Sequence, residues 1–190
     1  MLPTFTIYTG PMYGSKSTRL IGDIDRYTRR RRLVLAYKPQ IDNRYEEGKI
    51  CTHSGASVDA KCVSSGGDVL NHVNTVLYDY DNVQNVVVAV DEAFMIDGIA
   101  KALIEIYKKG ITVIVSSIQL SANFKPFEEI MYMMPYATKI EICPAVCAVC
   151  SEDAYYTFSK FEVGHAPVIG GSDLYEPRSF KHYPPIRNHD

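Results

Sequence analysis

Residues 4–18 form the feature that most restricts the possible folds. A strand-like apolar run, Thr4 to Tyr8, leads through Gly10 to Lys16-Ser17, and a segment with helical spacing follows. Strand, loop and helix with Gly and Lys-Ser between them is the layout of a phosphate-binding P-loop. In that motif backbone N–H groups face the phosphates, the Lys neutralises them, and the Ser hydroxyl holds Mg²⁺. The pattern assigns phosphate binding to Gly10, Pro11, Met12, Tyr13, Gly14, Ser15, Lys16, Ser17 and Thr18.

One position departs from the P-loop pattern. G-x-x-x-x-G-K-[ST] requires Gly at positions 10 and 15, but position 15 is Ser15 and the second glycine is Gly14. A residue other than Gly in the left-handed conformation costs on the order of 1–2 kcal/mol. Restoring the usual order by Gly14→Ser with Ser15→Gly, or Ser15→Gly alone, is expected to relieve that strain. On the pattern alone, an ordinary strand–turn–helix with a stray Lys remains an alternative.

Strand-like segments alternate with helical spacing along the next part of the chain. Leu20, Ile21, Ile24 and Tyr27 predict that one helix face packs on a sheet. Strands are predicted over 33–37, 86–90, 111–115 and 139–142, and helices over 68–78, 97–109 and 127–134. Pro39 is expected to close the first of these strands. Such alternation indicates an α/β parallel sheet that binds ligand at the carboxyl ends of its strands.

Residues 39–67 are polar and show little periodicity, so they are expected to be functional or partly disordered.

An acidic pair follows the most apolar of the predicted strands. Residues 86–90 are four valines and one alanine, and Asp91-Glu92 comes next. An apolar strand that ends in Asp-Glu is typical of a Walker B segment, in which the Asp assists Mg²⁺. Many strands end in acids, but a P-loop earlier in the same short chain favours the nucleotide-binding interpretation.

Length and charge exclude some classes of protein. The 190 residues suit one domain, or one domain with a small appendage. A net charge of −2 gives no overall field that favours nucleic acid, and no apolar stretch approaches the roughly 20 residues that span a bilayer. The basic cluster Arg29–Arg32 is expected to be a solvated helix end. Five Cys without a recognisable signal peptide favour a reducing compartment, so we expect a cytoplasmic location.

The C-terminal part carries a possible metal site. Cys147-Ala-Val-Cys150 is a C-x-x-C, which is half of a usual structural zinc site. His182 supplies a third candidate ligand, whereas position 179, which would complete a second pair, is Ser179. Cys143 or His165 are further candidates that spacing does not support. Two buried thiols or a redox pair remain alternatives to zinc.

Several segments together resemble one family. They are Gly10 to Thr18, Asp42-Asn-Arg-Tyr45, Asp91-Glu-Ala93, Lys125-Pro-Phe127, Ala145 to Cys150, Val168-Ile-Gly-Gly-Ser-Asp-Leu-Tyr175 and Lys181-His-Tyr183. In order and spacing the sequence is similar to the thymidine kinases shared by animals, bacteria, poxviruses and phages. The resemblance implies a P-loop (RecA-like) α/β domain over 1–142 and a small zinc-type lasso domain over 143–190. It also implies transfer of phosphate from ATP to the 5′-hydroxyl of thymidine, in nucleotide salvage.

The resemblance also implies a role for each matching residue. Glu92 is the general base that takes the proton of the 5′-hydroxyl, and Asp91 assists Mg²⁺ beside Ser17. Asp42 and Arg44 lie near the sugar and the transferred phosphate. The thymine is contacted by Met12, Ile118, Phe127, Val168, Ile169, Gly170, Gly171 and Tyr175. Zn²⁺ is held by Cys147, Cys150 and His182.

The family pattern is not matched everywhere. Phe94-Met95-Ile96 replaces Gln-Phe-Phe, Gln119-Leu120 replaces Asp-Gly, and Ala122 stands at an aromatic position with Phe124 nearby. A homotetramer and inhibition by the end-product triphosphate are expected from the resemblance, whereas the charge and the lack of a long apolar stretch predict no nucleic-acid or membrane partner. Two alternatives remain: another P-loop ATPase, in which Glu92 activates water, and a diverged homologue that binds nucleotide without catalysis.

Overall fold

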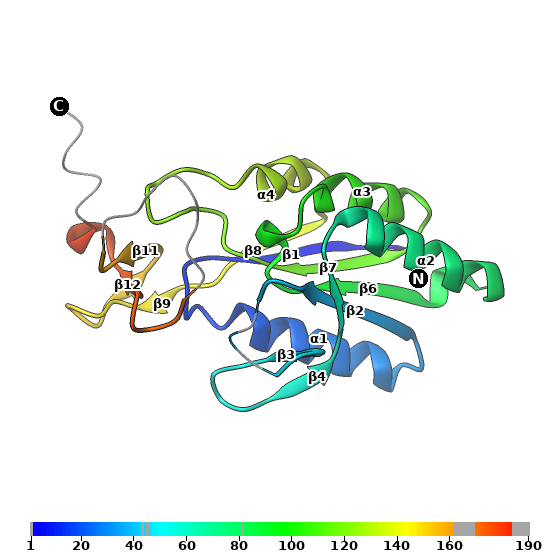
Figure 1. The fold of residues 1–190 in the computed structure, drawn as a ribbon, viewed down its shortest axis with the longest axis horizontal. Coiled ribbons are helices and arrows are strands. Elements are labelled where there is room, and N and C mark those ends of the chain that lie inside the picture. Colours follow the sequence, from blue (N-terminus) through cyan, green and yellow to red (C-terminus); the bar gives the residue numbers. More distant parts are fainter. Residues whose placement is uncertain (1, 43, 45, 81, 162–169, 184–190) are drawn as a thin grey trace.

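The computed structural model describes residues 2–42, 44, 46–80, 82–161 and 170–183. A six-stranded parallel sheet forms the centre of this described part (Figure 1). In spatial order its strands are β5 (Lys61–Val63), β2 (Leu33–Pro39), β6 (Val86–Val90), β7 (Thr112–Ser116), β1 (Phe5–Thr9) and β8 (Lys139–Ile142). All five pairings are parallel, so the segments that follow β1, β2, β6 and β7 emerge at the same edge of the sheet. The predicted α/β fold class is confirmed.

Helices cover both faces of the sheet, as Figure 1 shows. One face packs on α1 (Lys16–Arg29) and on the antiparallel hairpin of β3 (Lys49–Cys51) and β4 (Ser57–Asp59). The other face packs on α2 (Gly66–Asp79), α3 (Ile99–Lys108) and α4 (Glu128–Met133). Short 3₁₀ turns occupy Val83–Asn85, Ala93–Met95, Met134–Tyr136 and Phe180–His182.

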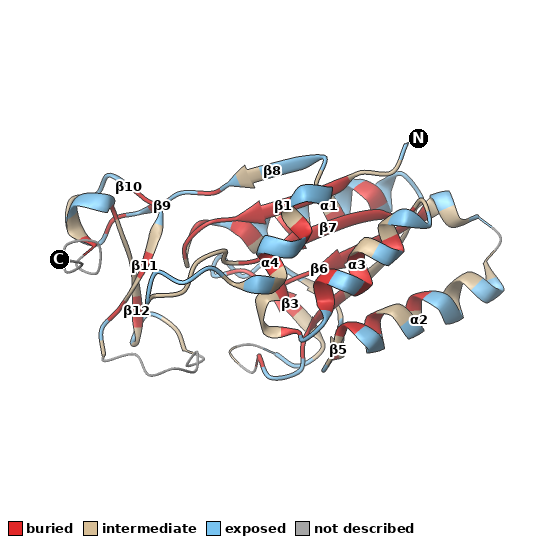
Figure 2. Cartoon of the chain, turned by 90° about the horizontal axis from the view of Figure 1, so that it is seen from above, coloured by how far each residue is buried: buried red, intermediate tan, exposed pale blue. Residues whose placement is uncertain are grey.

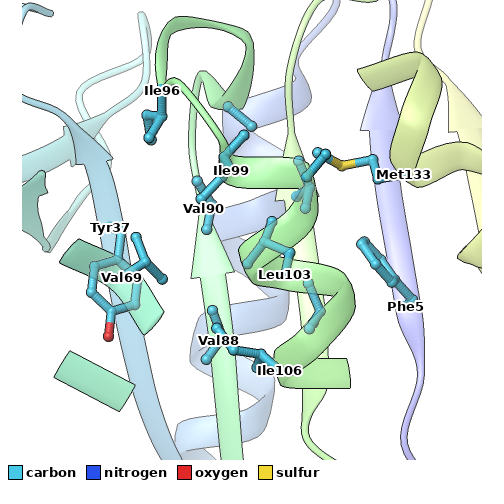
Figure 3. Close-up of a cluster of buried hydrophobic side chains, with 14 of the residues drawn as sticks. Phe5, Tyr37, Val69, Val88, Val90, Ile96, Ile99, Leu103, Ile106 and Met133 are labelled. Atoms are coloured by element: carbon cyan, nitrogen blue, oxygen red, sulfur yellow. The ribbon is translucent and has the colours of Figure 1, made fainter. Parts of the chain in front are cut away.

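The core lies on the two faces of the central strands. Every residue of β1, β6 and β7 is buried, which explains why these strands are continuously apolar or nearly so (Figure 2). Figure 3 shows side chains of α2, α3 and α4 meeting those of β1, β2 and β6, and Leu103 and Ile106 of α3 are fully buried there. On the opposite face Leu20, Ile24 and Tyr27 of α1 are buried, as their helical spacing predicts.

One expectation for the segment after α1 needs correction. The first strand after α1 runs to Pro39 rather than ending before it. Pro39 is tolerated because β2 pairs with β6 only as far as Tyr37, and beyond that residue it pairs with β5 alone. The stretch 39–67 contains β3, β4 and β5, each three residues long and therefore too short for periodicity to reveal.

The predicted helix over 68–78 begins earlier, at Gly66, because Ser65 and Asp68 form a capping box at its N-terminus. No helix among the described residues has the length and apolar character that a membrane crossing requires.

The C-terminal part consists of short paired strands at one end of the sheet (Figure 1). β9 (Ala145–Val146) pairs with β10 (Asp153–Ala154), and β11 (Tyr156–Ser159) pairs with β12 (Tyr175–Arg178). Side chains join this part to the rest of the described chain: Thr157 Oγ1 accepts a hydrogen bond from the Met12 N–H at 3.0 Å, and the Tyr183 hydroxyl donates to the Ala122 carbonyl at 2.6 Å.

Candidate active site

The P-loop follows β1 and rests on the backbone of Cys143. The Cys143 N–H donates to the Thr9 carbonyl at 2.7 Å, which fixes this residue beside the start of the loop. A Cβ atom on Gly10 or Gly14 would lie 2.2 or 2.3 Å from the Cys143 carbonyl oxygen. No side chain fits at either position, so Gly14 is required by a close backbone approach.

The displaced glycine therefore does not remove the strain at its neighbour. Ser15 adopts the left-handed conformation (φ 56°, ψ 28°) at the N-terminus of α1. The expectation that Ser15 carries the strain is consistent with this geometry. The expectation that the double exchange Gly14→Ser with Ser15→Gly relieves it is wrong, because a side chain at position 14 meets the Cys143 carbonyl.

Lys16 and Ser17 point to the carboxyl ends of neighbouring strands. Lys16 is buried and its Nζ donates to the Pro11 carbonyl at 2.6 Å. Burial lowers the pKa of Lys16, against the charges of Glu92 and Asp91. The Ser17 hydroxyl lies 3.0 and 3.1 Å from the two carboxylate oxygens of Asp91. The predicted Ser–Asp pair for Mg²⁺ is thus brought together from the first turn of α1 and the end of β6.

Asp91 is a buried acid with two hydroxyl partners. It accepts hydrogen bonds from Ser17 and from Ser116, which ends β7. Burial raises the pKa of Asp91 to about 6; the Glu92 charge adds to the shift, and the Ser116 and Ser17 hydrogen bonds oppose it. Oxygen ligands of this kind suit Mg²⁺, which is bound through one or two carboxylates together with phosphate oxygens.

Glu92 is held at one oxygen and free at the other. Arg44 Nη2 donates to Glu92 Oε1 at 2.6 Å, whereas Oε2 is buried and has no hydrogen-bond partner in the described structure. The backbone of Glu92 is left-handed (φ 48°, ψ 44°). Strain of this kind is of order 1–3 kcal/mol and occurs often at functional sites. Glu92 therefore presents one buried carboxylate oxygen that no described residue satisfies.

Arg44 links Glu92 to a second acid. Its Nε donates to Asp42 Oδ1 at 2.6 Å and its Nη2 to Asp42 Oδ2 at 3.0 Å. Burial favours the neutral acid, but the hydrogen bonds and charge of Arg44 hold the pKa of Asp42 below its ordinary value. The predicted residues Asp42, Arg44 and Glu92 therefore form one ionic network.

These groups surround a cavity of about 290 Å³. Of the predicted site residues, its wall includes Met12, Tyr13, Ser15, Lys16, Ser17, Thr18, Asp42, Arg44, Asp91 and Glu92. Lys38 and the hairpin residues 49–54 also line it, and no sequence motif assigned them to the site. A lysine at the end of an apolar strand was the available signal for Lys38. The hairpin offered only the polar segment Cys51-Thr-His-Ser54.

The residues expected at the thymine lie mostly outside this cavity. Phe127 packs on Phe94 with ring centroids 4.5 Å apart, and Tyr175 is buried against Phe161. Ile118, Gly170 and Gly171 are partly buried and are not among the described residues that line the cavity. Val168 and Ile169 lie outside the described residues.

The Cys/His residues come together in the C-terminal part. Ligand atoms of Cys147, Cys150 and His182 lie within 4.8 Å of one another, in an arrangement that could hold a metal ion. Ser179 Oγ lies 3.5 Å from Cys150 Sγ and 3.2 Å from His182 Nδ1. Around a tetrahedral zinc with bonds of about 2.0–2.3 Å, ligand atoms are separated by roughly 3.3–3.8 Å. The two distances from Ser179 Oγ are close to this range, whereas Cys147 Sγ and His182 Nδ1, at 4.0 Å, are slightly farther apart.

The protonation of Cys147 agrees with a metal ligand. Burial opposes its thiolate, but hydrogen bonds from the backbone and hydroxyl of Ser179 and from the N–H groups of Val149 and Cys150 lower the pKa of Cys147 to about 5. Cys143 is not part of the described cluster, since it is buried beneath the P-loop. His165 lies outside the described residues.

Sheet topology and site together define a P-loop nucleotide-binding protein of the α/β class. The chain belongs to the thymidine kinase family, because the model of that family matches residues 4–183. A "Thymidine kinase" of Pyrobaculum aerophilum is 32% identical over 185 residues, covering 93% of this chain and 96% of the relative. A "Thymidine kinase" of Roseiflexus castenholzii is 30% identical over 193 residues, covering 95% and 94%. The family predicted from the sequence is confirmed.

Proposed function

We propose that this protein transfers the γ-phosphoryl group of ATP to the 5′-hydroxyl of thymidine, in nucleotide salvage for DNA synthesis. The observation that carries the proposal is Glu92, whose Oε2 is buried and unpaired in a cavity that also contains a P-loop lysine and the Ser17–Asp91 pair. Family membership supports thymidine as the acceptor. A carboxylate near an incoming hydroxyl is what phosphoryl transfer to an alcohol requires.

On the donor side, residues 10–18 bind the phosphates of ATP. The N–H groups at the start of α1 face the phosphate oxygens, and Lys16 exchanges its contact with the Pro11 carbonyl for one with a phosphate. Ser17 and Asp91 would hold the Mg²⁺ that accompanies ATP. When bound, this ion neutralises charge on the phosphoryl oxygens.

On the acceptor side, Glu92 Oε2 accepts the proton of the 5′-hydroxyl as that oxygen attacks phosphorus. Arg44 keeps Glu92 Oε1 in place, and Asp42 keeps Arg44 in place, at 2.6 Å in each case. The attacking oxygen forms its bond to phosphorus while the bond to the ADP oxygen breaks. Positioning and charge neutralisation supply most of the catalysis in such a reaction.

For the base, we propose that residues 143–190 form a second domain that closes over the nucleoside. Met12 is its proposed contact on the P-loop side, and its N–H already donates to Thr157 of this part. Ile118, Phe127, Val168, Ile169, Gly170, Gly171 and Tyr175 are the further proposed contacts to thymine. A structural Zn²⁺ at Cys147, Cys150 and His182, a cytoplasmic location and a homotetramer complete the proposal.

A nucleoside panel tests this function. The protein is incubated with ATP, Mg²⁺ and one of thymidine, deoxyuridine, deoxycytidine or deoxyadenosine, and monophosphate and ADP are both measured. We expect thymidine monophosphate in amounts that match the ADP released. ADP release without a nucleoside would instead indicate an ATPase. Nucleotide binding without any product would indicate a non-catalytic homologue.

A further inference from the structure

Lys38 is a buried cation at the carboxyl end of β2. It is 3% exposed, and Tyr37 before it pairs with Val90, so Lys38 lies level with Asp91. Lysine is almost never fully buried unless it is paired, because removing an ammonium group from water is unfavourable. The partners of Lys38 therefore indicate what it does.

The described residues do not satisfy the Lys38 ammonium group. Its nearest carboxylate oxygen is Asp42 Oδ2, at 4.0 Å, and within the described part of the chain it donates no hydrogen bond. Both oxygens of Asp42 already accept hydrogen bonds from Arg44. An ammonium group has three donors, and the cavity is the space left for them.

The other lysine and arginine side chains of the cavity wall are engaged. Lys16 donates to the Pro11 carbonyl at 2.6 Å, and Lys49 pairs with Glu46 at 2.8 Å. Arg44 bridges Asp42 and Glu92. Among the described lysines and arginines that line the cavity, Lys38 alone has no partner closer than 4.0 Å. An anionic ligand is the chemistry that would satisfy it.

We propose that Lys38 binds an oxygen of the phosphoryl group while it passes from the nucleotide to the acceptor, and then holds the monophosphate product. The proposal rests on the proposed function for the identity of the acceptor. Lys38 and Arg44 then place two cations near Glu92, while Lys16 remains with the phosphates at the P-loop. The charge that develops on the transferring group meets a cation that is already desolvated.

The test compares Lys38→Met with Lys61→Met. Lys61 is the matched control because it pairs with Tyr37 on the neighbouring strand, is exposed and does not line the cavity. Calorimetry measures the binding of inorganic phosphate to each folded protein in the presence of ADP and Mg²⁺. We expect Lys38→Met to weaken phosphate binding at least about tenfold and ADP binding less than about threefold. Lys61→Met should match the parent in both.

Kinetics give a second readout. With thymidine, kcat of Lys38→Met should fall about 10²-fold, the range for one lost transition-state donor. The KM for thymidine should change less than about threefold, since Lys38 is not assigned to the base or the sugar. Lys38→Gln serves for the same comparisons if the Met variant does not fold.

The outcomes separate Lys38 from the proposed function. Phosphate affinity within about twofold of the parent overturns the role of Lys38, and so does an equal loss of phosphate and ADP binding, which marks a merely structural lysine. A selective loss of phosphate binding supports it. If the parent protein fails to phosphorylate thymidine, the proposed function is overturned. The calorimetric test of phosphate binding by Lys38 still holds in that case, because it contains no nucleoside.

Discussion

The P-loop and the Cys147–Cys150–His182 cluster each carry a serine where the usual motif has another residue, and the two serines differ in effect. The P-loop binds through backbone N–H groups, so Ser15 keeps the donor and only adds conformational strain. A metal ion at the cluster would be bound through side chains, so Ser179 would change the donor atom itself. We therefore expect a replaced side chain to be tolerated in the P-loop and to weaken metal binding at the cluster.

The largest effect should come from Glu92, which follows β6 and lines the same cavity as the P-loop. Glu92→Gln removes the proposed proton acceptor while keeping the shape of the side chain, and general-base catalysis contributes about 10²–10⁴-fold. We expect kcat with thymidine to fall on that scale, with ATP and thymidine affinities nearly unchanged. Glu105→Gln on the exposed side of α3 is the control. Near-normal turnover in Glu92→Gln would remove Glu92 from this role.

A side chain at position 14 should disturb the backbone site itself. Gly14→Ala places a Cβ 2.3 Å from the Cys143 carbonyl oxygen, and such overpacking costs about 1–3 kcal/mol. ATP affinity, measured by calorimetry, should fall about 10–100-fold.

Gly22→Ala on α1 is the matched control, since its Cβ would meet nothing within 4 Å. The double exchange Gly14→Ser with Ser15→Gly should be as weak as Gly14→Ser. An ATP affinity equal to that of the parent would show that Cys143 moves aside.

At the Cys147–Cys150–His182 cluster, replacing Ser179 by Cys should increase the affinity for zinc. Ser179→Cys adds a third sulfur ligand, so zinc affinity measured by chelator competition should rise at least about tenfold. Substitution with Co²⁺ should give a stronger sulfur-to-metal charge-transfer band than in the parent. Cys147→Ser should lower both. Unchanged zinc affinity in Ser179→Cys would mean that position 179 does not face the ion.

The smallest effect should come from relieving the strained serine. Ser15→Gly removes a left-handed non-Gly residue, worth on the order of 1–2 kcal/mol, against up to about 1 kcal/mol of extra ordering cost for Gly. ATP should bind up to about tenfold more tightly, with thymidine affinity unchanged. A weaker affinity for ATP would show that the Ser15 side chain itself takes part in binding.

The sequence predicted the parts of this molecule that have a repeating pattern or a local motif. Each of these patterns is complete within a short stretch of sequence: the valines of β6, the helical spacing of Leu20, Ile24 and Tyr27, and the P-loop residues. The Ser17–Asp91 pair was predictable as well, because parallel strands bring their carboxyl ends to one edge.

Other parts depend on contacts that leave no pattern in the sequence. Three-residue strands such as β3 and β4 are too short to show periodicity, so the hairpin wall of the cavity was missed. Lys38 becomes informative only once its burial and its distance from Asp42 are known. The need for Gly14 arises from a backbone carbonyl at Cys143, and any residue type supplies a carbonyl.

The Cys143 carbonyl limits where the protein can be truncated. A protein fragment that ends at residue 142 would contain the whole P-loop motif together with Asp91 and Glu92. It would therefore resemble a self-sufficient ATP-binding domain. It would lack Cys143, the very next residue, whose backbone carbonyl oxygen packs closely against Gly10 and Gly14. A truncated version of this protein should therefore end well beyond Cys143. The conformation of the P-loop depends on residues on both sides of the proposed domain boundary.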